Sequence, residues 1–138
     1  MIKLLDEKED KLIDEESETV REELTVEGVR AVRGFFFKIG LYSNLMGFDY
    51  LICAVGEVLH NPRCLHSITK DLYPKIAKQF KTTATGVERN IRNAIETACN
   101  RGKLREIANT FYGANFSKYE KPTNGEFISF ITNIARIG

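Results

Sequence analysis

The sequence predicts an all-α protein: a compact bundle of about six helices that contains a helix-turn-helix and follows an acidic N-terminal arm. Three observations predict this class. From Val29 onward the apolar residues recur at the spacing of a buried helix face, and no stretch alternates with the two-residue period of a strand. Glycine, proline and short polar breaks divide the chain at helix-length intervals. With 138 residues, 43% of them hydrophobic, the chain is long enough for one domain with a core.

The first helix is expected over residues 29–39, closed by Gly40, because glycine accepts the left-handed conformation that follows a helix end. A second helix is expected to start near Ser43 or Asn44 and to run to His60, where Asn61-Pro62 stops it. One short helical turn is expected over residues 65–70.

Four further elements complete the prediction. Residues 71–80 form a helix with Pro74 in its first turn, where the missing N–H costs nothing. The strongest helix covers about residues 84–100 and ends at Arg101-Gly102, and another covers residues 104–112 before Gly113. The last helix begins at Thr123, which has the T-x-x-E capping-box spacing with Glu126.

Composition excludes several classes of protein. No apolar run approaches the ~20 residues of a membrane helix, and the charged start over residues 1–10 is unlike a secretory signal. Three cysteines without close pairing oppose a disulfide framework and favour the reducing cytoplasm. The chain has no glycine-rich phosphate loop, G-x-S-x-G turn or H-E-x-x-H helix, so we expect no enzyme, no cofactor and no membrane partner.

Charge is unevenly distributed along the chain. Residues 1–27 contain eleven acids and four bases, a net charge of −7, whereas residues 28–138 carry +8. We interpret residues 1–28 as an acidic arm, helical or partly disordered, and residues 29–138 as a basic domain. This division indicates that the domain binds a polyanion. The alternative is an acidic first helix with a merely structural role.

Two helices joined by a tight polar turn have the lengths of a helix-turn-helix: residues 73–80, then residues 85–100. The second helix carries one apolar stripe that should pack inward, formed by Val87, Ile91, Ala94, Ile95 and Ala98. Its polar residues cluster near the N-terminus, where a recognition helix enters the major groove of DNA.

Three of these polar residues suit contact with DNA. Arg89 has the geometry for paired hydrogen bonds to guanine, Glu88 accepts from cytosine, and Arg92 suits a base or a phosphate. Lysines on the preceding segment should neutralise backbone phosphates, giving salt-sensitive affinity that is blind to sequence. These lysines are Lys70, Lys75, Lys78 and Lys81.

The pattern also has an ordinary structural explanation, because most surface helices carry an apolar stripe with charges elsewhere. Thr85 and Glu88 have a capping-box spacing, and that role would leave the Glu88 carboxylate less free to read a base.

Other chemistry-bearing residues predict no site. His60, Cys64 and His66 lie close together, with Cys53 upstream, but their spacing matches no common zinc pattern. Cys53 is expected in the core, and Cys99 has no nearby histidine in sequence for a catalytic thiol. We therefore expect no metal.

An aromatic run is expected in the core or in an interface with another protomer. It comprises Phe35, Phe36 and Phe37, with Leu41, Tyr42 and Phe48 nearby.

Five motifs carry a resemblance to one known family. They are ITKDLYPKIAKQF (68–80), TTA (82–84), VERNIRNAIE (87–96), NRG (100–102) and KPTNGEFI (121–128). Together they closely resemble the C-terminal effector domain of stage-zero sporulation protein A, the sporulation response regulator of endospore-forming Firmicutes. The resemblance is dense from about Leu65 to the end, weaker over residues 35–63, and absent over residues 1–28.

This resemblance implies a six-helix effector domain, here residues 29–138, that reads a short DNA box through its helix-turn-helix. It implies tandem binding of two copies, a dimer on DNA. Glu88, Arg89 and Arg92 stand where the family's motif has its base- and backbone-contacting residues.

The sequence departs from the family's motif at three places. Thr85-Gly86 replaces the usual Ser-Arg, which removes an arginine that would contact DNA. Asn93 replaces a histidine; asparagine can still bind adenine or a phosphate, so this change alters specificity as readily as it weakens binding. The chain also ends at Gly138 without the family's basic tail.

We expect the largest departure to be architectural, because 28 leading residues would leave no room for the family's phosphoacceptor receiver domain. We expect a sequence-specific transcriptional regulator without that switch, and DNA-binding residues that include Thr85 and Asn93. The alternative is a protein-interaction module, an antagonist that pairs with a full-length regulator and binds DNA poorly.

The charge division motivates one hypothesis about regulation, in which the acidic arm masks the basic surface. Deleting residues 1–27 should then raise the affinity for DNA at low salt, measured by a mobility-shift titration. An unchanged affinity would rule the hypothesis out.

Overall fold

The computed structural model describes residues 22–113 and 121–138 of the chain. Within these ranges the chain forms six α-helices, one 3₁₀ helix and one π-helix, and it contains no strand. The all-α prediction is therefore confirmed. In chain order the elements are α2 (Val26–Lys38), α3 (Met46–His60), η1 (Pro62–His66), η2 (Ile68–Leu72), α4 (Tyr73–Phe80), α5 (Ala84–Asn100), α6 (Leu104–Tyr112) and α7 (Asn124–Ile137).

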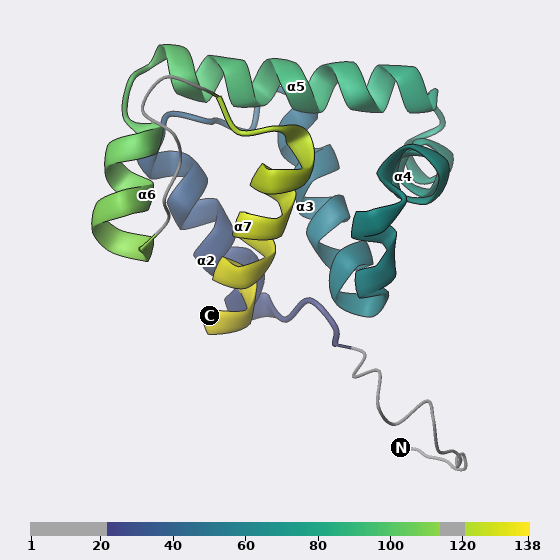
Figure 1. The fold of residues 1–138 in the computed structure, drawn as a ribbon, viewed down its shortest axis with the longest axis horizontal. Helices are drawn as coiled ribbons and strands as arrows, with labels where there is room; N and C mark the ends of the chain where they lie inside the picture. Colours follow the sequence, from purple (N-terminus) through teal and green to yellow (C-terminus); the bar gives the residue numbers. More distant parts are fainter. Residues whose placement is uncertain (1–21, 114–120) are drawn as a thin grey trace.

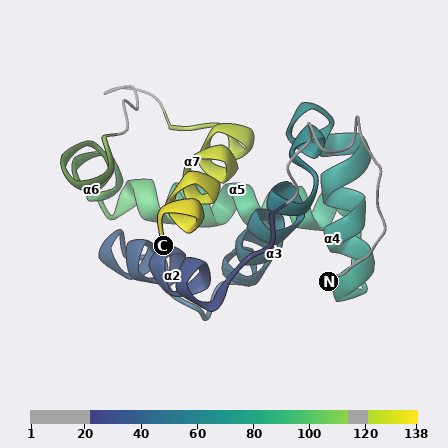
Figure 2. The same cartoon turned by 90° about the horizontal axis from the view of Figure 1, so that it is seen from below.

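The longest helix, α5, lies across one end of the molecule (Figure 1). Beneath it stand α2, α3 and α7, while α4 lies at its N-terminal end and α6 at its C-terminal end (Figure 1). The view from below shows the same three helices in front of α5 (Figure 2). The bundle thus supports α5 along one side and leaves its other side facing outward.

The core is built from side chains on these supporting helices and on α5. Phe36 of α2 meets Phe48 of α3 at a ring-centroid distance of 5.1 Å and stacks on Phe127 of α7 at 6.2 Å. Phe35, Phe36, Leu51, Ile91 and Phe127 are all completely buried. One aromatic cluster therefore joins the helices on which α5 rests.

The α3 and α5 helices cross at Gly47, near the start of α3. A Cβ atom on this residue would lie 2.3 Å from the Asn90 carbonyl oxygen and 2.7 Å from the Ala94 Cβ atom. Only a residue without a side chain allows this approach, so Gly47 fixes how closely α5 sits on the bundle.

Most predicted boundaries are confirmed within a few residues. Gly40, Gly102 and Gly113 adopt positive φ angles after α2, α5 and α6, as helix-ending glycines do. The capping box of Thr123 and Glu126 is present at the start of α7.

Other boundaries differ from the prediction: α3 begins at Met46 rather than near Ser43 or Asn44, and Asp71 and Leu72 belong to η2 rather than to α4. The first described helix begins at Val26 rather than Val29, since the Thr25 side chain accepts a hydrogen bond from the Gly28 N–H and caps it. The expected single turn over residues 65–70 is instead a 3₁₀ helix followed by a π-helix.

Residues 22–25 lie against the end of the molecule opposite α5 (Figure 1). The Glu22 N–H donates to the Leu59 carbonyl at 3.0 Å, and Arg136 pairs with the Glu22 carboxylate at 2.7 Å. Leu24 packs against the core. The rest of the proposed acidic arm, residues 1–21, lies outside the described residues, so its masking role stays a prediction.

The structure refines the expectations for Cys53 and for the aromatic run. Cys53 packs against the core as expected but is only half-buried, and its thiol donates to the Gln79 side-chain oxygen of α4 at 2.7 Å. The aromatic run divides: Phe35 and Phe36 are buried, whereas Phe37 is 72% exposed. No described helix is long and apolar enough to cross a membrane.

Candidate nucleic-acid interface

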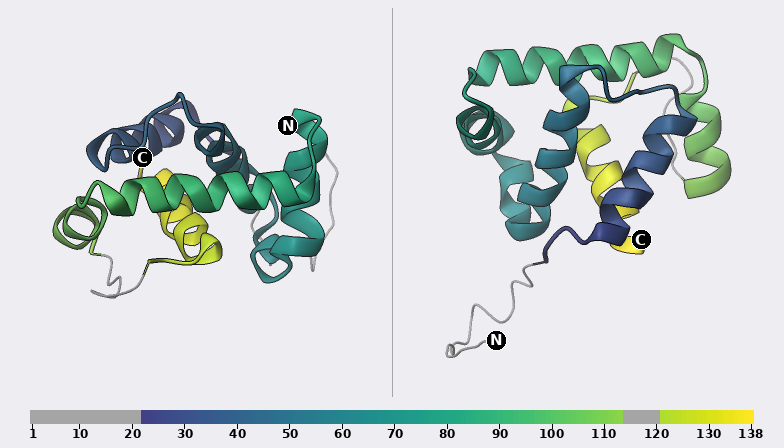
Figure 3. Two further views of the ribbon diagram at one scale, coloured as in Figure 1. Left: turned by 90° about the horizontal axis from the view of Figure 1, so that it is seen from above. Right: turned by 180° about the vertical axis from the view of Figure 1, so that it is seen from behind.

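The helix-turn-helix consists of α4, the turn at residues 81–83, and α5. Lys81 ends α4 in the left-handed conformation at φ 57°, and the Thr82 N–H donates back to the Ala77 carbonyl at 2.9 Å. The left-handed residue reverses the chain within the turn, so α4 lies beside the N-terminal end of α5 (Figure 3).

The inward face of α5 is the predicted one. Its buried residues are Val87, Ile91, Ala94, Ile95 and Ala98. Periodicity alone identified this stripe, because each of these residues lies three or four positions from another member of the stripe.

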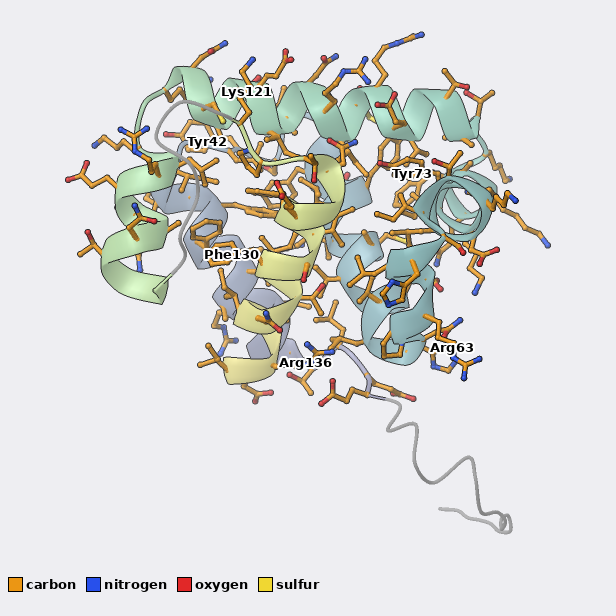
Figure 4. All side chains as sticks on the ribbon, viewed as in Figure 1. Tyr42, Arg63, Tyr73, Lys121, Phe130 and Arg136 are labelled. Atoms are coloured by element: carbon orange, nitrogen blue, oxygen red, sulfur yellow. The ribbon has the colours of Figure 1, made fainter. Side chains whose placement is uncertain are left out.

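The outward face of α5 carries the predicted contact residues. Seen from above, α5 runs across the front of the molecule, and no described helix crosses over it (Figure 3). Thr85, Arg89, Arg92 and Asn93 are exposed, and Glu88 is partly exposed. Side chains project from this helix into open space along its length (Figure 4).

The N-terminus of α5 is capped differently from the prediction. The Thr83 side chain, not that of Thr85, accepts the hydrogen bond, from the Gly86 N–H at 3.0 Å. The capping box of Thr85 and Glu88 is therefore wrong, because the helix begins at Ala84 and places Thr85 inside its first turn. Gly86 fits closely here, since a Cβ atom would lie 3.1 Å from the Thr83 hydroxyl oxygen.

This cap predicts that substituting Thr83 lowers the stability of the protein more than substituting Thr85. Thr83→Ala should lower the free energy of unfolding by about 1 kcal/mol, because it removes the acceptor for an N-terminal N–H. Thr85→Ala, the matched control, should change it by less than about half that amount. Urea denaturation checks both, and equal losses would contradict the cap assignment.

The Glu88 carboxylate binds another side chain rather than capping the helix N-terminus. It pairs with the Arg92 guanidinium one turn later, and their side chains are 37% and 47% exposed. The hydrogen bond from Arg92 to Glu88 raises the pKa of the Arg92 guanidinium, and nearby Glu96 adds to the effect. The pair is accessible to solvent, so both charges are available to an incoming ligand at the cost of their mutual contact.

A groove of about 540 Å³ runs along this side of α5. Its walls include Glu88, Arg92 and Glu96 from α5 and Lys121 from the segment before α7. The Lys121 ammonium lies 3.5 Å from the Glu96 carboxylate, so the charges alternate along the wall.

The floor of this groove contains a polar contact between three helices. The Asn124 side-chain amide of α7 donates to the Tyr73 hydroxyl of α4 at 2.9 Å and to the Glu88 carbonyl of α5 at 3.2 Å. Burial raises the pKa of the Tyr73 hydroxyl. Figure 4 shows Tyr73 beneath α5 and beside α4.

The predicted lysines surround the supporting helix. Lys70, Lys75, Lys78 and Lys81 are all exposed. The charge of Lys75 lowers the pKa of the buried Cys64 thiol, partly offsetting the larger raising effect of burial.

No group of three or more histidine, cysteine, aspartate or glutamate residues in the described part of the chain is placed to hold a metal ion. Burial, with a smaller contribution from Glu57, raises the pKa of the Cys53 thiol to about 11, and burial also raises that of Cys99. Both thiols are therefore protonated near neutral pH and poorly nucleophilic.

Comparison with known families matches residues 32–134 to the family described as "Sporulation initiation factor Spo0A C terminal". This match covers well over half of the chain. The chain belongs to this family. The Spo0A C-terminal family is a family of DNA-binding domains that act in transcription regulation during sporulation, and the matched region contains α4, α5 and the groove beside them.

Sequence reasoning alone missed three residues of this site: Tyr73, Lys121 and Asn124. Their contacts join elements far apart in the chain, and no local periodicity can indicate such contacts. The available signal was membership of the family-like motifs at residues 68–80 and 121–128, which together contain all three.

Proposed function

We propose that the protein is a non-enzymatic transcriptional regulator that binds double-stranded DNA sequence-specifically, with α5 in the major groove. The observation that supports this most strongly is the outward face at the N-terminal end of α5, where polar side chains lie uncovered. A recognition helix needs this arrangement, because its N-terminal turns must reach the base edges.

Each contact residue has a distinct role in this proposal. Arg89 is exposed and suits a paired contact with guanine. Glu88 accepts from cytosine once Arg92 leaves it for a phosphate or a base. Thr85 and Asn93 lie before and after these residues on the exposed surface and complete the contact with the duplex.

The lysines supply affinity rather than specificity. Lys70, Lys78 and Lys81 are exposed around the supporting helix and neutralise phosphates. Lys75, exposed on the same helix as Lys78, contributes in the same way. A DNA partner implies a cytoplasmic location, and tandem binding would place a second copy on the same duplex.

The pair between Glu88 and Arg92 leads to a prediction that separates affinity from specificity. Glu88→Gln should release Arg92 to contact a phosphate, so the slope of log affinity against log salt should steepen by up to about one. Preference for the best sequence should fall at the same time, because a carboxylate acceptor is lost. Glu106→Gln, at an exposed position on α6, is the control and should change neither quantity.

The proposal itself is tested by titrating the full chain against randomised duplex DNA at two salt concentrations. We expect salt-dependent binding to the whole pool and enrichment of one short box from it. Binding without any enrichment would contradict sequence-specific regulation.

A second candidate function, a protein-interaction module, is favoured by a different surface. Phe37, Tyr42 and Met46 are 72%, 47% and 52% exposed, and the rings of Phe37 and Tyr42 lie 6.0 Å apart. Such side chains are common in protein interfaces. A full-length regulator of this family is the expected partner, and adding one to the titration distinguishes the two functions: an antagonist would bind it and reduce its DNA binding.

A further inference from the structure

We propose that Asn124 is a positioning residue for DNA reading, which holds the N-terminal part of α5 in register with α4 although it does not itself contact DNA. The inference rests on the proposed function. It assigns a role in sequence discrimination to α7, a helix outside the helix-turn-helix.

The geometry of one amide group carries this inference. The Asn124 amide has two N–H donors, and it is shared between the Tyr73 hydroxyl and the Glu88 carbonyl at 2.9 and 3.2 Å. These partners belong to the first residue of α4 and to the first turns of α5. A single side chain therefore connects the supporting helix and the recognition helix.

The surroundings fix the Asn124 side chain in place. Thr123 and Glu126 cap α7 reciprocally on either side of it, which sets the backbone at its first residue. The next residue, Gly125, allows close packing on η2, because a Cβ there would lie 2.9 Å from the Ile68 side chain. Tyr73 is only 5% exposed, so its hydroxyl can move little.

The Asn124 contact affects DNA reading because its second acceptor, the Glu88 carbonyl, lies in the recognition helix. The Glu88 carbonyl belongs to the turn that presents Glu88, Arg89 and Arg92. Rotation of this turn relative to α4 would move Arg89, which contacts the base. The lysines around α4, which contact phosphates, would stay in place. Base contacts depend strictly on such geometry, whereas phosphate contacts tolerate small displacements.

The test uses the full chain and two duplexes: the box that wild-type protein selects from a random pool, and a scrambled version of it. The quantity measured is the ratio of the two dissociation constants, in which any loss of folded protein cancels. We expect Asn124→Ala and the isosteric Asn124→Asp, which cannot donate when ionised, to lower this ratio about tenfold. In Asn124→Ala, the affinity for the scrambled duplex should stay within about twofold and the salt slope should not change, because no charge is altered.

Two further variants make the assignment specific. Asn133 is an exposed asparagine near the other end of α7, and Asn133→Ala should leave the ratio unchanged. Tyr73→Phe keeps the buried ring and should lower the ratio in wild-type protein but not in Asn124→Ala, since both act through one contact. If Asn124→Ala does not fold, the Tyr73→Phe variant alone still tests the proposal.

The outcomes are distinguishable. An unchanged ratio in both Asn124 variants, or an equal loss in Asn133→Ala, would overturn the positioning role while leaving the proposed function intact. A ratio retained in Asn124→Asp but lost in Asn124→Ala would assign the effect to shape rather than to hydrogen bonding and would also overturn it. A wild-type ratio near one would overturn the proposed function and this inference together.

Discussion

Arg89→Ala is expected to abolish most of the protein's preference for its selected DNA box while retaining binding to unrelated duplexes. Arg89 is exposed on the outward face of α5, next to Glu88 and within the first turns. A paired contact between arginine and guanine contributes about 1–3 kcal/mol of discrimination, which corresponds to roughly one to two orders of magnitude in the ratio of affinities. Competition titrations with selected and scrambled duplexes measure this ratio.

The control variants separate base reading from general electrostatics. Arg63→Ala removes the same charge from an exposed arginine that lies at the far end of the molecule from α5 (Figure 4), and it should change neither affinity nor preference. Lys78→Ala should weaken binding to every sequence alike and flatten the salt dependence. If Arg89→Ala lost affinity equally on all sequences, its role would be that of a phosphate contact.

Gly47→Ala is expected to be the most destabilising of the substitutions considered, because it forces a methyl group into the crossing of α3 and α5. The added Cβ would lie 2.3 Å from the backbone oxygen of Asn90 and 2.7 Å from the Ala94 Cβ. Backbone atoms of a packed helix cannot give way locally, so the two helices must separate. Overpacking of this kind costs about 1–3 kcal/mol or more.

Gly34 provides a matched control on another helix. It lies exposed within α2, and a Cβ there would meet nothing within 4 Å. Gly34→Ala should therefore stabilise the protein by about 0.5–1 kcal/mol, as expected for alanine replacing glycine in a helix. Denaturant unfolding of both variants checks the pair, and a Gly47→Ala protein as stable as wild type would contradict the close crossing.

Much of this fold could be predicted from the sequence because its signals are local. The stripe from Val87 to Ala98 repeats at helical spacing, and Gly40, Gly102 and Gly113 mark helix ends through a conformation that glycine adopts most readily. The capping box at Thr123 needs only residues three positions apart.

The remaining features depend on tertiary contacts or on competition between similar local choices. Thr83 and Thr85 are equally good capping residues in sequence, and the helix start at Ala84 decides between them. Pairing of Glu88 with Arg92 follows from that start, because the carboxylate is then free of the cap. Asn124 reaches Tyr73 only after α7 has folded against α4 and α5.

The central claim, that the N-terminal turns of α5 bind the duplex, is tested most directly by backbone amide NMR during titration with the selected DNA. We expect the largest chemical-shift changes over residues 81–93, with small changes over residues 56–63 and 130–138, on the opposite side of the bundle. Largest changes around Phe37, Tyr42 and Met46, with residues 81–93 unaffected, would contradict it.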